Sequence, residues 1–147
     1  MSLFLGGTSS ANECHDYEEG SFTMSLSQGS NTSNSGRYVK IGTMVLAAGN
    51  VSLDNISSGS TVQINGLPFT SDGGGVGRSY NGAIRGYNCS NISGSGMRPT
   101  NAVIHGDGTN VQFGTFESAQ AWSMMAYNDF TSTNNSIRWT CVYKSND

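Results

Sequence analysis

The sequence predicts an all-β domain of the antiparallel sandwich or barrel type. Short apolar runs, rich in β-branched and aromatic residues, alternate with clusters of Gly, Ser and Asn, a pattern typical of strands joined by turns. The length of 147 residues suits one domain with a sizeable core. A net charge of -3 and an aromatic content of 10% argue against a disordered chain.

The chain divides into a short leader and one sandwich domain. Residues 1–19 are expected to be an acidic leader, because they hold several carboxylates and show no apolar periodicity. Residues 20–147 are expected to form the sandwich. Its candidate strands are, in order, Ser21–Leu26, Arg37–Ile41, Thr43–Leu53, Thr61–Asn65, Tyr80–Asn88, Asn101–His105, Asn110–Phe116 and Ser136–Tyr143.

Glycine and proline positions predict how these strands are joined. Gly42 interrupts the run from Gly36 to Leu53, which therefore reads as a hairpin. Asp107-Gly108 gives the strongest hairpin signal, between two apolar runs. Gly66-Leu67-Pro68 predicts a corner, because proline is tolerated where a strand ends.

The run Thr43–Leu53 carries apolar side chains on both faces. A strand at the surface of a sandwich normally alternates with polar residues. We therefore expect this strand either to be covered on both faces or to contact another subunit with its outer face. Val45 is assigned to that outer face, with a place in the core as the alternative.

Composition excludes several classes of partner. A sequence pI near 5.2 without a basic run makes nucleic acid an unexpected partner. No apolar run is long enough to span a membrane. The odd number of cysteines, Cys14, Cys89 and Cys141, indicates free thiols in a protein folded in reducing cytoplasm.

No catalytic residue, metal ligand or cofactor is expected. Neither histidine lies at zinc-site spacing from Cys14, and no G-x-S-x-G elbow occurs. The glycine-rich stretch from Asp72 to Ser79 lacks the ending of a phosphate loop. Sugar-cleaving enzymes need a pair of carboxylates. Asp54, Asp72, Asp107 and Asp129 instead stand beside turn residues, where Asp caps the backbone.

One loop is the expected ligand-binding site. Arg78, Tyr80 and Asn81 follow the glycine-rich stretch, and Tyr80 is placed at an exposed loop tip. An aromatic ring can stack on a sugar, while Arg and Asn donate hydrogen bonds to its hydroxyls. A neutral surface rich in hydroxyls and amides also suits carbohydrate. The next candidates are the loops Asn88–Arg98 and Thr131–Asn135.

Three phrases give the chain a family resemblance. They are DYEEG at Asp16–Gly20, GRYVKIG at Gly36–Gly42 and INGLPFTS at Ile64–Ser71. In this order they resemble the C-terminal, distal domain of bacteriophage tail fibres, which typically reads DYEEGT, GRYTKIGN and ISGLPFTS. The chain departs from that pattern at Ser21–Met24, where the family has T-[WF]-T-P, and in its glycine-rich loop and cysteines.

The resemblance implies a jelly-roll-like β-sandwich that forms a homotrimer in the virion tail and is made in the bacterial cytoplasm. It implies non-catalytic attachment to the bacterial surface, by binding a surface glycan or protein. Two alternatives stay open: a polysaccharide depolymerase with acids at a subunit interface, and a purely structural virion cap or decoration protein. The segment Ser118–Tyr127 holds good helix formers. The resemblance instead favours a turn at Glu117–Gln120 and a strand at Trp122–Ala126.

Overall fold

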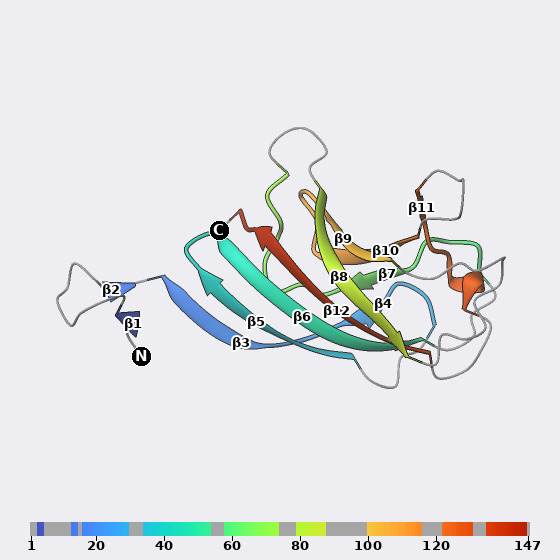
Figure 1. The fold of residues 1–147 in the computed structure, drawn as a ribbon, viewed down its shortest axis with the longest axis horizontal. Helices are drawn as coiled ribbons and strands as arrows, with labels where there is room; N and C mark the ends of the chain where they lie inside the picture. Colours follow the sequence, from blue (N-terminus) through green and yellow to red (C-terminus); the bar gives the residue numbers. More distant parts are fainter. Residues whose placement is uncertain are drawn as a thin grey trace.

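A computed structural model shows an almost entirely antiparallel β protein whose main sheet curls nearly into a closed barrel (Figure 1). It describes residues 3–4, 13–14, 16–29, 34–53, 58–73, 79–87, 100–115, 122–130 and 135–146. The expected all-β class is confirmed. No helix of the described residues is both long and apolar enough to cross a membrane.

The main sheet has ten strands and is best followed as two halves that share strand β8. The first half runs, in spatial order, through β3 (Tyr17–Thr23), β5 (Asn34–Ile41), β6 (Met44–Leu53), β12 (Asn135–Lys144) and β8 (Ser79–Tyr87). The second half continues through β9 (Asn101–His105), β10 (Asn110–Thr115), β7 (Gln63–Asn65) and β4 (Ser25–Leu26), with β11 (Ser123–Met124) beside β10.

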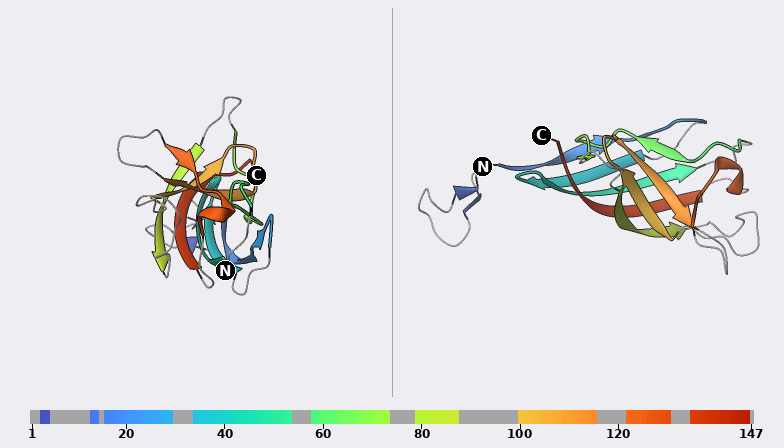
Figure 2. Two further views of the ribbon diagram at one scale, coloured as in Figure 1. Left: turned by 90° about the vertical axis from the view of Figure 1, so that its right-hand side faces the viewer. Right: turned by 90° about the horizontal axis from the view of Figure 1, so that it is seen from above.

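Two features make this sheet curl back on itself. In β8, Ala83–Tyr87 pairs with β12, whereas Ser79–Gly82 pairs with β9, so one strand belongs to both halves. The two end strands β3 and β4 are neighbours in sequence, separated only by the buried Met24. The end view in Figure 2 shows the resulting curvature.

The N-terminal stretch contains more strand than expected. β1 (Leu3–Phe4) pairs with β2 (Glu13–Cys14) as a separate two-stranded sheet. β3 begins at Tyr17, inside the expected leader, and pairs along its whole length with β5. Glu18 and Glu19 are therefore residues of an edge strand, where charged side chains are common because they discourage pairing with another chain.

Both expected hairpins are confirmed. β5 and β6 pair from Ile41–Met44 onward around Gly42, which has a φ of 58°. β9 and β10 pair around Asp107, whose φ of 60° is one that Asp tolerates better than most residues. The expected corner also forms: Gly66 has a φ of 101°, and its N–H donates to the carbonyl of Thr109 at 3.0 Å.

The described part of the ambiguous segment is not helical. Ser123–Met124 forms β11 against Gly114 and Thr115, and only a single 3-10 turn, Tyr127–Asp129, follows. A strand was expected over Trp122–Ala126, so the structure confirms its core. The expected turn at Glu117–Gln120 lies outside the described residues.

The core lies between the two halves. In β12 the side chains alternate: Ile137, Trp139, Cys141 and Tyr143 are buried, while the residues between them are exposed. The second half adds buried residues that include Ile64, Ile104, Val111 and Phe113. Val45 is also fully buried, so its assignment to the outer face was wrong. The side chains alternate along β6, and the outer face carries Met44 and Leu46 instead.

Candidate functional site

The structure describes two of the three expected site residues, Tyr80 and Asn81, and it places them on opposite faces of β8. Arg78 lies outside the described residues. Tyr80 is in β8 and not at a loop tip: its ring packs edge-on against Tyr143, and its hydroxyl donates to the carbonyl of Asp72 at 3.1 Å. Asn81 points to the other face, where its side-chain oxygen accepts from Nδ2 of Asn101 at 3.0 Å.

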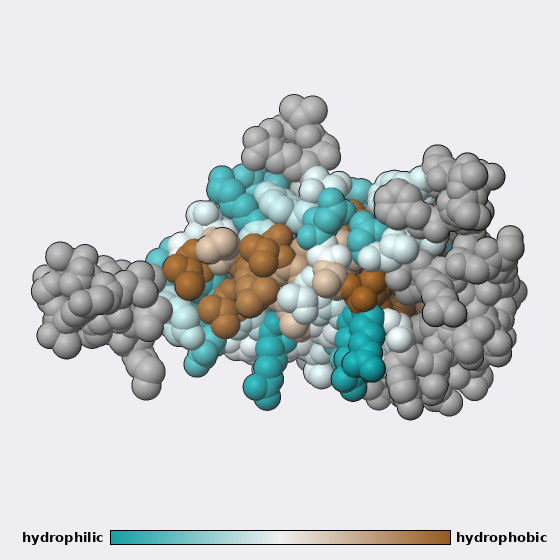
Figure 3. Space-filling view, viewed as in Figure 1, coloured by the Kyte–Doolittle hydropathy of each residue, from teal (hydrophilic) through white to brown (hydrophobic). Residues whose placement is uncertain are grey.

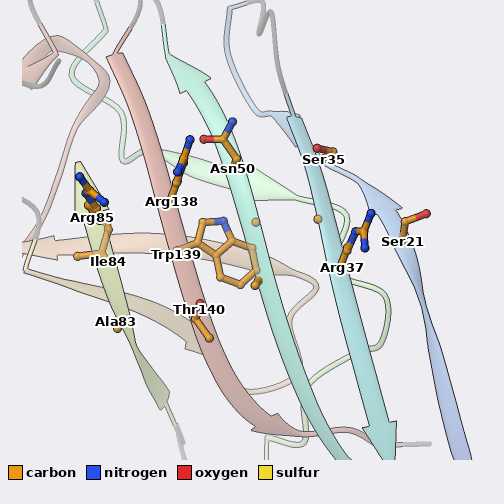
Figure 4. A pocket seen from close by; sticks show the side chains of 13 residues that line it. Ser21, Ser35, Arg37, Asn50, Ala83, Ile84, Arg85, Arg138, Trp139 and Thr140 are labelled. Carbon is orange, nitrogen blue, oxygen red and sulfur yellow. The ribbon is translucent and has the colours of Figure 1, made fainter. Parts of the chain in front are cut away.

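The most distinctive surface is instead the outer face of the first half of the sheet. A groove of about 640 Å³ crosses this face over β3, β5, β6, β12 and β8 (Figure 4). We call it the arginine groove. Its lining residues are Ser21, Ser35, Gly36, Arg37, Ala48, Gly49, Asn50, Ala83, Ile84, Arg85, Arg138, Trp139 and Thr140.

Small residues create the depression in the outer face of the sheet. Ala48 and Ala83 face outward with only a methyl group. Gly36 and Gly49 are required for the packing below the groove: a Cβ on Gly36 would lie 2.2 Å from the Phe22 ring, and one on Gly49 would lie 2.8 Å from Trp139. The two aromatic rings thus fill the inner side, and the outer side stays open.

Three arginines stand around this low surface. Arg37, Arg85 and Arg138 are the three arginines of the described residues, and each is exposed. Arg85 and Arg138 are direct cross-strand partners, and Figure 4 shows their side chains near each other at one end of the groove. Arg37 stands at the other end, near Ser21 and Ser35. In an acidic chain, this places much of the positive charge on one face.

Hydroxyl and amide groups complete the lining. Asn50 is the cross-strand partner of Arg138 on the side away from Arg85. Its Oδ1 accepts a hydrogen bond from the Ser136 hydroxyl at 2.9 Å, which fixes the orientation of the amide. Ser21, Ser35 and Thr140 add hydroxyls along the groove. The groove can therefore donate many hydrogen bonds, several of them from charged groups.

A second depression of about 610 Å³ continues the groove across β5 and β6. It shares Ser21, Arg37 and Ala48 with the first and adds Glu19, Val39 and Leu46 among others. Tyr38 also lines it, and its hydroxyl donates to Glu18; this hydrogen bond raises the pKa of Tyr38 above its ordinary value.

Beyond this depression the outer face becomes apolar. The exposed side chains there are Ile41, Met44, Leu46 and Val142, with exposed fractions of 41%, 55%, 45% and 49%. We call these four residues the outer apolar patch. They are neighbours across strands, because Ile41 faces Met44 and Leu46 faces Val142. Figure 3 shows the patch as a brown area over β5, β6 and β12.

The described carboxylates do not form a catalytic pair in the groove. Asp129 accepts the N–H of Ala126, three residues earlier, at 2.8 Å, so capping of its own turn is confirmed there; Asp107 instead accepts the N–H of Gly73, which is distant in sequence, at 3.2 Å. Asp72 forms an ion pair with Lys144 at 2.8 Å. Asp54 lies outside the described residues. Within the described part of the chain, no three metal-ligating side chains gather.

The structure establishes the state of one cysteine thiol, that of Cys141. Cys141 is a free cysteine, buried in β12, and its burial raises its pKa to about 11. The thiol is therefore protonated at neutral pH, which makes it a packing residue and a poor nucleophile. The expectation of a free thiol is confirmed at this position. The side chains of Cys14 and Cys89 lie outside the description.

Sequence reasoning missed the arginine groove because it searched the loops. The available signal was that Arg37, Arg85 and Arg138 all fall inside expected strands, in a chain with few charges. Only the register of β8, β12, β6 and β5 brings them onto one face. Comparison of the chain with family models, with curated proteins and with solved structures gives no match.

Proposed function

We propose that this chain is a non-catalytic domain at the tip of a bacteriophage tail fibre, and that it helps attach the virion to the bacterial surface by binding a glycan. The observation that carries the proposal is the arginine groove, an open polar site of about 640 Å³. The family resemblance supports it, since its three phrases fall in β3, β5 and the stretch from β7 through the Gly66 corner to Ser71.

The chemistry of the groove fits a sugar chain. Sugars present many hydroxyls, and the groove offers guanidinium, amide and hydroxyl donors along its length. A shallow, open groove also suits an extended polymer that enters from the side. No carboxylate of the described residues lines it, so the described part of the chain supplies no acid pair like that of a sugar-cleaving site. The groove therefore supports binding in preference to cleavage.

The proposal includes assembly into a homotrimer in the virion tail. The outer apolar patch supports it, because a subunit contact would remove four exposed apolar side chains from water. Three weak sites on one trimer would gain avidity on a surface that repeats the same glycan. Synthesis in bacterial cytoplasm agrees with the free thiol of Cys141.

Binding to bacterial cells tests the proposal. The purified chain, labelled with a fluorophore, is mixed with a panel of bacterial strains, and bound label is measured by flow cytometry. Arg138→Gln removes a groove charge, while Lys144→Gln removes a charge from the same face of the same strand outside the groove. We expect the Arg138 variant to lose most of its binding to strains that the wild type recognises, and the Lys144 variant to keep it.

Four outcomes would contradict the proposal. Equal binding by both variants would place the site elsewhere. Periodate oxidation of the cells should abolish binding, and unchanged binding would indicate a protein receptor. Release of reducing sugar from the bound strain's capsule would favour a depolymerase with acids at a subunit interface. A stable trimer that binds no strain would favour a structural cap.

A further inference from the structure

We infer that the arginine groove recognises an acidic sugar, and that Arg85 and Arg138 together bind its anionic group, a carboxylate or a phosphate. This inference rests on the proposed function and narrows its ligand class. Its basis is a pair of neighbouring arginines that no carboxylate of the described residues neutralises.

The two guanidinium groups start from neighbouring points. Arg85 in β8 and Arg138 in β12 are directly opposite each other in an antiparallel register and project from the same face. Paired residues on adjacent strands are separated by only about 5 Å. Two long side chains from such positions can reach one anion, and Figure 4 shows them at the same end of the groove. Asn50 flanks Arg138 on its other side.

The chain itself supplies no counter-charge to this pair among the described residues. Each carboxylate whose side chain is described has its partner elsewhere. The pairs are Asp16 with Lys40, Glu18 with Tyr38, Glu19 with Tyr17, Asp72 with Lys144, Asp107 with Gly73 N–H and Asp129 with Ala126 N–H. Like charges directly opposite in a sheet are unfavourable. An external anion would remove this repulsion and would accept charge-assisted hydrogen bonds from both arginines.

Arg37 is expected to contact a different portion of the ligand from the one that Arg85 and Arg138 bind. It lies on β5, two strands away from Arg138, so the backbones are about 10 Å apart. It is therefore placed to contact the next portion of an oligosaccharide, together with Ser21 and Ser35, and not the same anion. The predicted ligand is an acidic oligosaccharide that lies across β8, β12, β6 and β5.

Nuclear magnetic resonance titration tests the inference with simple probes. The Nε–Hε signals of the three arginines are followed while glucuronate, glucose 6-phosphate or glucose is added at constant ionic strength. We expect both acids to shift the signals of Arg85 and Arg138, and glucose to leave them almost unchanged. The tighter of the two acids identifies whether a carboxylate or a phosphate is preferred. Added NaCl should weaken binding of both acids, because the contact is electrostatic.

Variants make the test residue-specific. Arg85→Gln and Arg138→Gln should each raise the Kd for the acids about tenfold or more, as expected for loss of a charge-assisted hydrogen bond. Lys144→Gln should leave it unchanged. Equal shifts by glucose and glucuronate would overturn the inference and leave glycan binding intact. Failure of both acids to shift Arg85 and Arg138 would overturn it too, and the cell-binding experiment would still decide the proposed function independently.

Discussion

Val45 and Leu46 are consecutive residues of β6 that stand on opposite faces of the sheet: Val45 is completely buried, whereas Leu46 remains 45% exposed. Both are apolar, but their environments differ entirely. Val45 lies in the core between the two halves of the sheet, and Leu46 lies in the outer apolar patch between Val39 and Val142. The same substitution at the two positions should therefore have different consequences.

We predict that Val45→Glu unfolds the chain and that Leu46→Glu leaves it folded but dissociates the proposed trimer. A charge forced into the apolar core costs several kcal/mol, whereas Glu at position 46 remains hydrated in a monomer. Circular dichroism measures folding, and light scattering measures mass. A wild-type monomer at micromolar concentration, or an intact trimer in the Leu46 variant, would show that the patch has another role.

The Phe22 ring and Gly36 provide a second prediction. Gly36→Ala should lower the free energy of unfolding by about 1–3 kcal/mol, because the new methyl group overlaps the ring. Replacing the Phe22 ring with a smaller side chain, in the double variant Gly36→Ala with Phe22→Leu, should reduce this loss of stability. Urea denaturation of the four proteins of this cycle measures the coupling. Gly59→Ala is the matched control, since its nearest neighbour, Nδ2 of Asn128, is 4.0 Å from the added Cβ.

Cys141 should resist modification in the folded protein. Its thiol is buried and its pKa is raised to about 11, so iodoacetamide should react with it slowly until the chain is denatured. Mass spectrometry of the native and the denatured protein measures this, and denaturation without reductant should expose all three cysteines as free thiols. A disulfide that includes Cys141 would contradict the prediction.

Because of the same thiol, the free energy of unfolding should fall as the pH rises into the alkaline range. The pKa of Cys141 is higher in the folded chain than its ordinary value of 9.0, so its contribution is fully present below that value. It is lost as the pH rises toward about 11, because only the unfolded chain then ionises the thiol freely. Cys141→Ala should remove this part of the pH dependence, as urea denaturation at several pH values would measure.

Arg85→Gln should stabilise the unliganded chain while it weakens binding. Removing one of two directly opposed charges should raise the free energy of unfolding by about 0.2–1 kcal/mol at low ionic strength. The gain should shrink in high salt, where the repulsion is already screened. Arg37→Gln, whose cross-strand partners are Ala48 and Ser21, should show no such gain. A stabilised Arg37 variant would mean that the whole surface, and not the arginine pair, is repelling itself.

The sequence was most informative where apolar alternation and turn residues agree. Asn101–His105 was predicted with its observed ends, because the apolar run stops at the Asp107 turn. Tyr17–Glu19 was missed because an edge strand can carry charge on both faces, which hides the alternation. The alternation of apolar and polar residues is not enough to predict the arginine groove. The sequence shows that Arg138 and Arg85 are in strands, but their opposition depends on which distant strands pair and in what register.

The position of β12 has a consequence for synthesis of the chain. β12 lies between β6 and β8 and contributes Trp139 and Tyr143 to the core, yet it is made long after the β5–β6 hairpin. At translation rates of about 5–20 residues per second, roughly 5 to 20 seconds separate the two events. During that interval β6 lacks its pairing partner β12, and its apolar side chains and unpaired edge remain exposed. The nascent chain is therefore prone to misfolding and aggregation at this stage. A delay or pause between residues 53 and 135 would therefore lower the yield of folded protein, although it alters no residue of the finished molecule.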